Sequence, residues 1–132
     1  MTYFLDTNVI IDLLNGNTNV LLNFKTAFQN GTIQIPDIVY YEVLRGFYWK
    51  DPKKQLENFE VFVRTCGIKY KDMQTLKIAA TQWAALKRKG TPLEDDGDIL
   101  IGSLAIQHNA ILVTNNISHL SKLQGIQLEN WR

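Results

Sequence analysis

The chain has 132 residues, of which 45% are hydrophobic, and its formal net charge is +1. This length and composition fit one globular domain over residues 1–132 and exclude a disordered chain, whereas the nearly neutral charge identifies no partner. No apolar stretch approaches the roughly 20 residues that a membrane span needs, and we expect no signal peptide before the first strand. Because Cys66 is the only cysteine, no internal disulfide can form, and we expect a cytoplasmic protein without membrane contact.

Strand and helix signals alternate along the first half of the chain. Apolar periodicity, helix-capping residues and glycine stops mark the boundaries of these segments. In chain order they predict a buried strand over residues 1–6, a short helix over residues 7–15 ended by Gly16, a helix capped by Asn17 or Thr18 and stopped by Gly31, a strand over residues 32–35, a helix capped by Asp37, and a helix restarted at Asp51-Pro52.

The second half of the chain continues the alternation. In chain order it predicts a short strand over residues 67–70, an amphipathic helix from its cap at Asp72 to Gly90, a helix from an acidic loop to Asn109, a strand over residues 110–114, and a final strand over residues 126–128. The apolar spacing of the amphipathic helix predicts that Trp83 is a core residue. This alternation predicts an α/β protein whose mostly parallel sheet is covered by helices on both faces.

Acidic residues gather where such a sheet would hold a site, which is beyond the carboxyl ends of its strands. Asp6 ends the first strand and Glu42 follows the second, while four further carboxylates lie within residues 94–98. A single acid is enough to cap a helix. Two unit charges ~4 Å apart repel each other by about 4 kcal/mol at an effective dielectric of ~20. The crowding of four acids therefore indicates that a cation binds at the start of the following helix.

Other polar residues have simpler interpretations. We expect Asp37 to cap its helix and Asp12 to be solvated, because Asp12 points away from the acid that ends the first strand. His108 and His119 lie in separate elements without acid or cysteine partners at metal-ligand spacing, so neither is expected to take part in catalysis.

Two basic groups stand out in the charge pattern. They are Lys50, Lys53 and Lys54 in one segment and Lys87, Arg88 and Lys89 in another. Such groups are usually solvated faces or helix ends, but they could also guide a polyanion towards an acidic, metal-loaded site.

Four segments resemble the motifs of PIN-domain ribonucleases, in the right order along the chain. The segments are Phe4–Ile10, Tyr41–Gly46, Asp96–Ser103 and Leu112–Leu120. The ending Gly125–Trp131 is similar to that of VapC-type toxins, which belong to toxin–antitoxin systems. One motif alone is weak evidence for this resemblance, but four motifs in the right order along the chain are specific. The resemblance implies a PIN-like three-layer α/β/α sandwich with a mostly parallel central sheet.

The resemblance also implies the residues of a site. Asp6, Glu42 and Asp98 match the metal-binding acids of the family, and Asn116 stands at a fourth catalytic position that often carries aspartate in relatives. Asp98 is preferred to Asp96 because it directly precedes the segment Ile-Leu-Ile-Gly-Ser, where the third acid usually stands. Asparagine adds no negative charge, which argues against a tightly held second metal. Residues expected to support the site from nearby are Thr7, Asn8, Asp96 and Thr114.

The activity that the resemblance implies is Mg²⁺-dependent hydrolysis of RNA phosphodiester bonds by an endoribonuclease toxin. Mg²⁺ or Mn²⁺ can polarise phosphoryl oxygens and lower the pKa of a bound water. These hard cations prefer carboxylate oxygens, so three acids without histidine suit them better than zinc. The resemblance further implies a homodimer and a cognate antitoxin that neutralises the toxin, but the sequence does not identify the RNA.

Three adjacent aromatics, Phe47, Tyr48 and Trp49, end the third predicted helix. Neighbouring helix positions point about 100° apart, so the three rings cannot all face one core. One interpretation places one or two rings in the core and leaves another partly exposed. The other places part of the cluster in a groove for an antitoxin segment, since interfaces favour aromatic residues.

Two other functions remain open from the residues alone. A non-catalytic, receiver-like signalling module also places acids and Mg²⁺ at strand ends. It usually has adjacent acids after its first strand and a lysine after its last, whereas Asp6 stands alone and no lysine follows Leu128. A phosphatase with a nucleophilic aspartate usually opens with Asp-x-Asp, but Asn8 occupies the second of these positions.

Overall fold

Five strands and seven helices make up the computed structural model, which describes residues 1–132. In chain order they are β1 (Thr2–Leu5), α1 (Thr7–Leu14), α2 (Thr18–Asn30), β2 (Thr32–Pro36), α3 (Asp37–Lys50), α4 (Lys53–Cys66), β3 (Ile68–Lys69), α5 (Met73–Arg88), α6 (Asp96–Gln107), β4 (Ile111–Val113), α7 (Ile117–Leu120) and β5 (Gln127–Glu129). Every predicted element is present, with ends that differ by one or two residues, and only the short α7 has no predicted counterpart.

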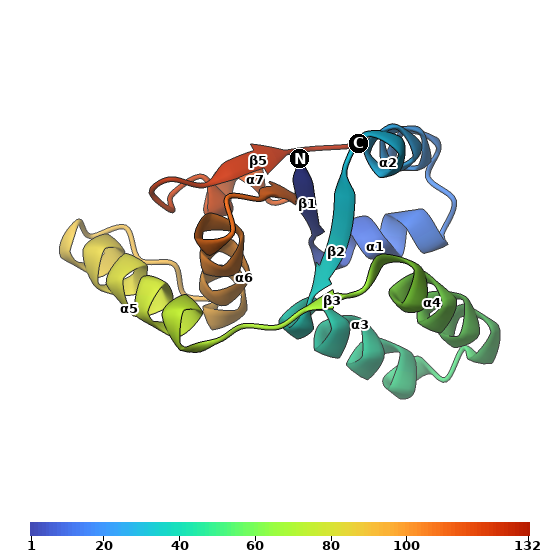
Figure 1. Ribbon diagram of the computed structural model, residues 1–132. Helices are drawn as coiled ribbons and strands as arrows, with labels where there is room; N and C mark the ends of the chain where they lie inside the picture. Colours follow the sequence, from blue (N-terminus) through green and yellow to red (C-terminus); the bar gives the residue numbers. More distant parts are fainter.

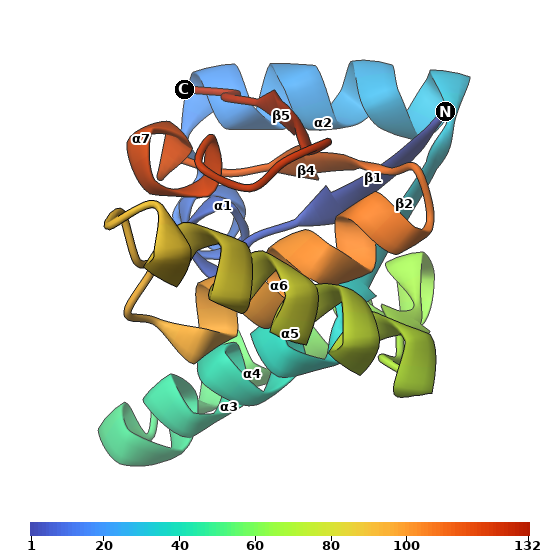
Figure 2. The same ribbon diagram turned by 90° about the vertical axis from the view of Figure 1, so that its left-hand side faces the viewer.

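Helices cover both faces of the sheet, which gives the molecule three layers. In Figure 1, α5 and α6 lie on one side of the strands, and α1, α2 and α4 lie on the other. Figure 2 views the molecule from the first of these sides and shows α5 in front of α6. This arrangement confirms the predicted three-layer α/β/α sandwich. No helix has both the length and the apolar character that crossing a membrane requires.

The sheet is parallel throughout and has the strand order β3-β2-β1-β4-β5. The chain moves outward from β1 to β2 and β3, and then returns to place β4 on the other side of β1. The strand order therefore reverses between β1 and β4, where Leu5 lies opposite Val113. In open α/β sheets, ligands bind in the crevice outside the carboxyl ends of the strands at such a reversal.

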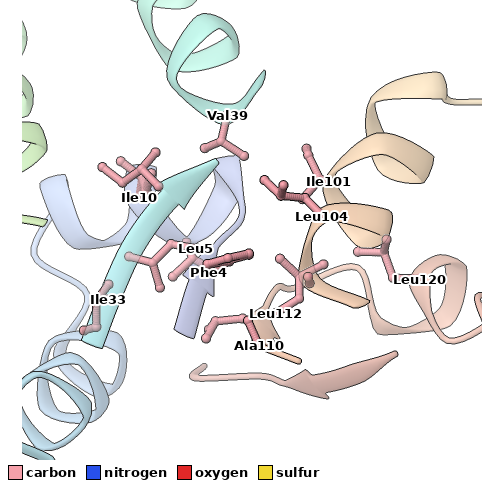
Figure 3. Packing of buried hydrophobic residues seen from close by; sticks show 14 of the residues in the cluster. Phe4, Leu5, Ile10, Ile33, Val39, Ile101, Leu104, Ala110, Leu112 and Leu120 are labelled. Atoms are coloured by element: carbon pink, nitrogen blue, oxygen red, sulfur yellow. The ribbon is translucent and has the colours of Figure 1, made fainter. Parts of the chain in front are cut away.

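The core surrounds the two central strands. Phe4 and Leu5 of β1 and Leu112 of β4 are fully buried, because both faces of these strands are covered by helices. Figure 3 shows Leu104 of α6 facing these strands. At Gly102 of α6, an added Cβ would overlap a methyl group of Leu123. The glycine therefore permits the close packing that seats α6 against the segment following α7.

Two of the predicted helix caps are confirmed and one is wrong. The side chain of Asn17 accepts a hydrogen bond at the start of α2, and that of Asp72 caps α5. Asp37 does not cap α3, because β2 runs one residue further than predicted and Pro36 takes the cap position. Asp37 is instead the first helical residue, and its carboxylate forms an ion pair with Lys71 at 3.2 Å.

The prediction that Trp83 is a core residue is wrong. Its side chain is 44% exposed and borders a groove between α5 and α6. Helix α5 lies at the edge of the molecule and packs mainly on α6, so it buries only a narrow stripe of its surface. The ammonium group of Lys87 lies 4.8 Å from the centre of the Trp83 ring, an arrangement that suits an exposed aromatic side chain.

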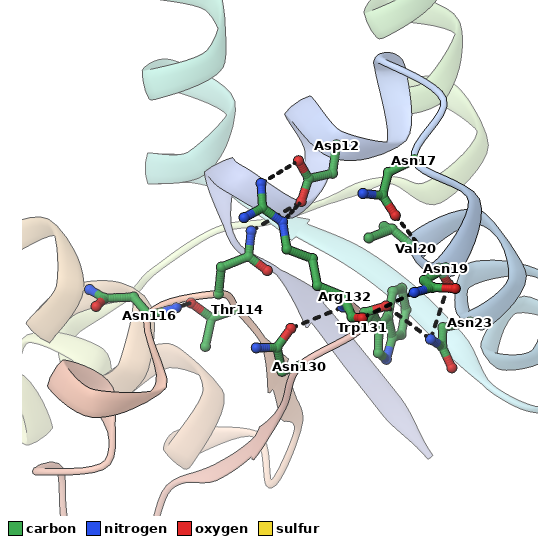
Figure 4. Close-up of polar contacts among 11 residues, drawn as sticks. Asp12, Asn17, Asn19, Val20, Asn23, Thr114, Asn116, Asn130, Trp131 and Arg132 are labelled. Atoms are coloured by element: carbon green, nitrogen blue, oxygen red, sulfur yellow. Dashed lines mark hydrogen bonds and ion pairs between the residues drawn. The ribbon is translucent and has the colours of Figure 1, made fainter.

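The prediction that Asp12 is solvated is also wrong. Asp12 is only 8% exposed, and its carboxylate accepts hydrogen bonds from Arg132 at 2.8 and 3.0 Å and from Asn115 at 3.0 Å. The segment after β5 runs back to α1 and carries Arg132 to this position (Figure 4). The hydrogen bonds and charge of Arg132 hold the pKa of Asp12 below its usual value. Local sequence periodicity contains no sign of this long-range pairing.

Candidate active site

Asp6 lies at the carboxyl end of β1, directly beside the end of β4. It caps α1, and its Oδ1 accepts a hydrogen bond from the backbone N–H of Thr7 at 2.8 Å. Its Oδ2 accepts a hydrogen bond from the hydroxyl group of Thr114 at 2.7 Å, in the turn after β4. Burial raises the pKa of Asp6, and the two hydrogen bonds oppose this rise. The carboxylate is therefore fixed in place but lacks a cationic partner.

Glu42 reaches the same region from α3. Its Oε1 accepts a hydrogen bond from the hydroxyl group of Thr7 at 2.6 Å, so Thr7 contacts Asp6 through its backbone and Glu42 through its side chain. A Cβ added at Gly97 would lie 3.4 Å from Glu42 Oε2 and 3.0 Å from Asp95 Oδ1. The glycine therefore lets the first turn of α6 come close to the other acids.

Asp98 stands in the first turn of α6. Its carboxylate is oriented by Asn116 and His119, which follow β4 in the chain. The side-chain amide of Asn116 donates to Asp98 Oδ2 at 3.3 Å, and the Oδ1 of Asn116 lies 2.8 Å from Nδ1 of His119. Because an amide oxygen can only accept, Nδ1 of His119 must carry the proton. His119 therefore sets the orientation of the Asn116 amide, and Asn116 in turn positions the carboxylate of Asp98.

The acids influence one another's ionisation. The pKa of Asp98 is raised to about 6, first by burial and then by the negative charges of Asp95, Asp6 and Glu42. These four carboxylates come from three separate parts of the chain and lie close enough to influence one another electrostatically. Like charges held together without a partner favour the binding of a cation.

Most residues of the predicted site line one pocket of about 260 Å³. Its lining residues are all polar or charged, and they are Asp6, Thr7, Asn8, Glu42, Arg45, Asp95, Asp98 and Asn116. Thr114 does not line the pocket, because it is fully buried beside Asp6. Asp96 does not line it either, because it faces the groove that contains Trp83.

Sequence reasoning missed three residues of this region. Asp95 lines the pocket and also caps α6, but in the sequence it was one of four acids within residues 94–98 without a feature to distinguish it. Arg45 lines the pocket from α3, and its spacing of three residues from Glu42 on one helix could have indicated this. His119 was not expected to take part, because its contact with Asn116 depends on the unpredicted α7.

The donor set fits a hard divalent cation. Four carboxylates surround the pocket, and no histidine or cysteine lines it, which suits Mg²⁺ or Mn²⁺ rather than zinc. No three acidic, histidine or cysteine side chains are arranged to hold one ion directly. Mg²⁺ usually takes only one or two carboxylates and keeps several of its waters. An ion that these acids would hold partly through its own bound waters therefore agrees with this lining.

Each residue of the turn after β4 donates a hydrogen bond to a different acid. The pairs are Thr114 with Asp6 at 2.7 Å, Asn115 with Asp12 at 3.0 Å, and Asn116 with Asp98 at 3.3 Å. Figure 4 shows Thr114 and Asn116 of this turn together with the Asp12–Arg132 pair. The turn thus connects the acidic pocket to the contact between α1 and the last residues of the chain.

Comparison with known proteins agrees with this geometry. The family model described as PIN domain matches residues 3–124. The chain belongs to the PIN domain family. Among curated relatives of this PIN domain, Ribonuclease VapC2 of Rickettsia felis is 32% identical, and the match covers 99% of this chain and 98% of the relative. The tRNA(fMet)-specific endonuclease VapC of Salmonella typhimurium is 26% identical, with the same coverage.

Solved structures show the same fold. A structure of VapBC2 from Rickettsia felis bound to a DNA fragment from its promoter contains a chain with a TM-score of 0.92 and 29% identity, and the match covers 100% of both chains. DNA-bound VapBC from Salmonella typhimurium gives a TM-score of 0.89 at 25% identity, covering 100% of this PIN domain and 99% of that chain.

Proposed function

We propose that this PIN domain is a Mg²⁺-dependent endoribonuclease toxin of the VapC type, which hydrolyses RNA phosphodiester bonds and is neutralised by a cognate antitoxin. The observation that carries the proposal is the meeting of Asp6, Glu42 and Asp98 around one polar pocket. These acids come from the end of β1, from α3 and from α6. The relatives named ribonuclease and endonuclease match nearly the whole chain, which supports the same activity here.

In this proposal, Asp6, Glu42 and Asp98 would hold Mg²⁺, in part through its bound waters, and Mn²⁺ can replace it. The bound ion would supply charge neutralisation at phosphoryl oxygens and a water of lowered pKa. Thr7 and Thr114 hold the carboxylates of Glu42 and Asp6 through their hydroxyl groups. These hydrogen bonds keep the acids oriented before substrate arrives, which lowers the cost of reorganisation during the reaction.

Asn116 and Asp95 have different tasks from the three ligands. Asn116 donates to Asp98, so it orients a ligand without adding charge to the site. Asp95 is held at the start of α6 by accepting the N–H of Gly97 at 2.8 Å, and it adds to the negative potential around Asp98. This potential attracts the cation, and without a cation it would repel the phosphates of RNA.

A receiver-like signalling module is less well supported. The sheet order of such folds is 2-1-3-4-5, whereas the order here is β3-β2-β1-β4-β5. No lysine lines the acidic pocket, where the only cationic side chain is that of Arg45. The opening residues Asp6, Thr7 and Asn8 likewise lack the second acid that a phospho-accepting site or an aspartate-based phosphatase usually has.

The partners in this proposal are RNA, an antitoxin and a second copy of the chain. The solved VapBC structures with closely similar folds support an antitoxin partner. The homodimer follows from the resemblance to the family, whose members commonly associate as symmetric pairs. Sedimentation of the purified protein at about 20 µM tests the dimer, and a monomer at this concentration would contradict it.

One experiment tests the activity itself. Purified protein is incubated with RNA in the presence of Mg²⁺ or of a chelator, and the lengths and ends of the products are determined. Internal cleavage that requires Mg²⁺ supports the endoribonuclease. A phospho-aspartate trapped on the protein, with the RNA left intact, would instead support the signalling module or the phosphatase.

A further inference from the structure

A second cavity, of about 500 Å³, continues directly from the acidic pocket. Its lining residues are Pro92, Leu93, Glu94, Asp95, Asp98, Asn116, His119 and Lys122. It shares Asp95, Asp98 and Asn116 with the smaller pocket that holds Asp6 and Glu42. A chain-like ligand bound at the carboxylates can therefore extend into this cavity without leaving the surface of the protein.

Side chains of opposite charge line this cavity. Glu94 and Asp95 come from the segment just before α6, whereas Lys122 comes from the segment just after α7. The molecule contains only two ion pairs, Lys71 with Asp37 and Arg132 with Asp12. Lys122 is therefore unpaired, even though acids line the same cavity.

The acidic pocket has an unpaired cation at its other end as well. Arg45 lines the pocket that contains Asp6 and Glu42, but it does not line the larger cavity. Its guanidinium group lies 5.2 Å from the centre of the Tyr41 ring and forms no ion pair. The shared acids thus lie between Arg45 on one side and Lys122 on the other.

We propose that these joined cavities form a track for the backbone of an RNA strand, in which Arg45 and Lys122 bind the phosphates on either side of the bond that is cleaved. This inference rests on the endoribonuclease function proposed above. A strand whose central phosphate meets a metal ion at the acids must place neighbouring phosphates close to Glu94 and Asp95. Lys122 and Arg45 supply the positive charge that offsets this repulsion.

The lining of the larger cavity favours backbone over base recognition. No phenylalanine, tyrosine or tryptophan lines it, and its one aromatic ring, that of His119, is held by the hydrogen bond to Asn116, so it offers little surface for base stacking. Phosphate contacts from lysine or arginine fix the register of a strand but carry no sequence information directly. The track therefore positions RNA, and the choice of target sequence must depend on other surfaces.

His119 and Lys122 have separate tasks in this track. His119 is hydrogen-bonded through Nδ1 to Asn116, so it belongs to the chain of contacts that orients Asp98. Lys122 makes no side-chain hydrogen bond and no ion pair in the structure, and its backbone N–H bonds to the carbonyl of His119. Its ammonium group is free for phosphate, and its replacement should leave the fold intact.

The test measures binding separately from cleavage. A short single-stranded RNA with a fluorescent end label and 2′-O-methyl groups at every position serves as a probe, and its dissociation constant is measured by anisotropy at several salt concentrations with Mg²⁺ present. The proteins are the wild type, Lys122→Gln, Lys122→Arg and the control Lys25→Gln. Lys25 is an exposed lysine of α2 that lines neither cavity.

We expect Lys122→Gln to weaken binding by about two- to fivefold, as for one exposed charge contact. It should also reduce the slope of log Kd against log salt by about 0.7, the value for one phosphate of a single strand. Lys122→Arg should retain wild-type binding, because it keeps the charge, and Lys25→Gln should change neither quantity. The same pattern is expected for Arg45→Gln.

Two other outcomes would overturn the proposal in distinguishable ways. If the wild type cleaves RNA and Lys122→Gln binds the probe exactly as Lys25→Gln does, the track is wrong and the endoribonuclease function stands. If the wild type neither cleaves unmodified RNA nor binds the probe, the proposed function fails, and the track fails with it.

Discussion

At the scale of single residues, the proposed RNA cleavage depends on the carboxylate of Asp98. We predict that Asp98→Asn lowers the rate of RNA cleavage by about 100-fold or more, because it removes a charge that binds the metal ion. Asp6→Asn and Glu42→Gln should have similar effects. The rate is measured on one RNA substrate at saturating Mg²⁺, with thermal unfolding to confirm the fold.

Asp96→Asn is the matched control for this change. Asp96 stands two residues before Asp98 in the same helix, but it faces the groove of Trp83 and not the acidic pocket. Its replacement should therefore leave most of the activity in place. Full Mg²⁺-dependent activity in Asp98→Asn, or an equal loss in the two variants, would remove Asp98 from the ligand set.

The raised pKa of Asp98 predicts how stability depends on pH in metal-free protein. The pKa is about 6 in the folded protein against an ordinary value of 3.8, so the folded state holds more protons between these two values. Its stability should therefore fall as the pH rises from about 4 to about 6, and the loss should persist above pH 6. Asp98→Asn removes this contribution.

The melting temperatures of wild type and Asp98→Asn are compared in a chelator across this pH range. The advantage of the variant should grow with pH and level off above about pH 6. A constant difference between the two proteins at all pH values would show that the pKa of Asp98 is not raised in the folded protein.

Asn116 offers a test in which function is gained. Asn116→Asp replaces the amide that donates to Asp98 with a fifth carboxylate at the edge of the pocket. We predict tighter binding of Mn²⁺, since carboxylates attract hard cations. We also predict a lower melting temperature in chelator at pH 7, because the new charge repels Asp98. Unchanged Mn²⁺ affinity in calorimetry would place Asn116 outside the metal site.

At the level of elements, the contact between α1 and the residues after β5 has the clearest energetic consequence. Arg132→Met leaves the buried carboxylate of Asp12 without its cationic partner, a change that destabilises folded proteins. We predict that the melting temperature at pH 7 falls by a few degrees. Because the pKa of Asp12 is lowered in the folded protein, its contribution exists above pH 3.8 and disappears as the pH falls through the folded value.

Lys71→Met provides the control for Arg132→Met. The Lys71–Asp37 pair is also an ion pair at the molecular surface, but Asp37 is less buried than Asp12 and remains at the start of α3. Its loss should therefore change stability little. If the two variants lowered the melting temperature equally, the burial of Asp12 would not contribute to the effect of losing Arg132.

The elements themselves were largely predictable, because their signals are local. Asn17 and Asp72 cap their helices as predicted, since a cap involves only neighbouring backbone N–H groups. The pairing of Asp12 with Arg132 could not be predicted, because the two residues are 120 positions apart. Trp83 was misplaced because periodicity reveals an apolar helix face but not how much of that face a neighbouring helix covers.

The acids of the site were predicted from the resemblance to PIN domains rather than from spacing. Asp6, Glu42 and Asp98 do line one pocket, but their roles as ligands stay a prediction. The contributions of Arg45 and Asp95 depend on how α3 and α6 approach one another, which the sequence alone does not fix. Asp96 was expected near the site, yet it lies on another side of the same helix start.

At the scale of the whole molecule, the aromatic end of α3 is available to a partner. Phe47 is buried, whereas Trp49 is 86% exposed, so the fold does not depend on the Trp49 ring. We predict that Trp49→Ala weakens antitoxin binding by about tenfold, as for an aromatic hot spot, and leaves the melting temperature nearly unchanged.

Trp83→Ala is the control for Trp49→Ala, because Trp83 is also exposed but lies in the groove between α5 and α6. Both variants are titrated with the cognate antitoxin. Wild-type affinity in Trp49→Ala would exclude this end of α3 as the docking groove, although it would leave the nuclease proposal untouched.

The position of β1 between β2 and β4 also governs when the protein can become active during its own synthesis. Asp6 leaves the ribosome early, but its partner Thr114 follows 108 residues later. At translation rates of about 5 to 20 residues per second, this interval is roughly 5 to 20 s. Throughout that time one edge of β1 lacks its partner strand β4, and Asp6 lacks the hydrogen bond from Thr114. We therefore expect a nascent chain to acquire nuclease activity only when its synthesis is nearly complete.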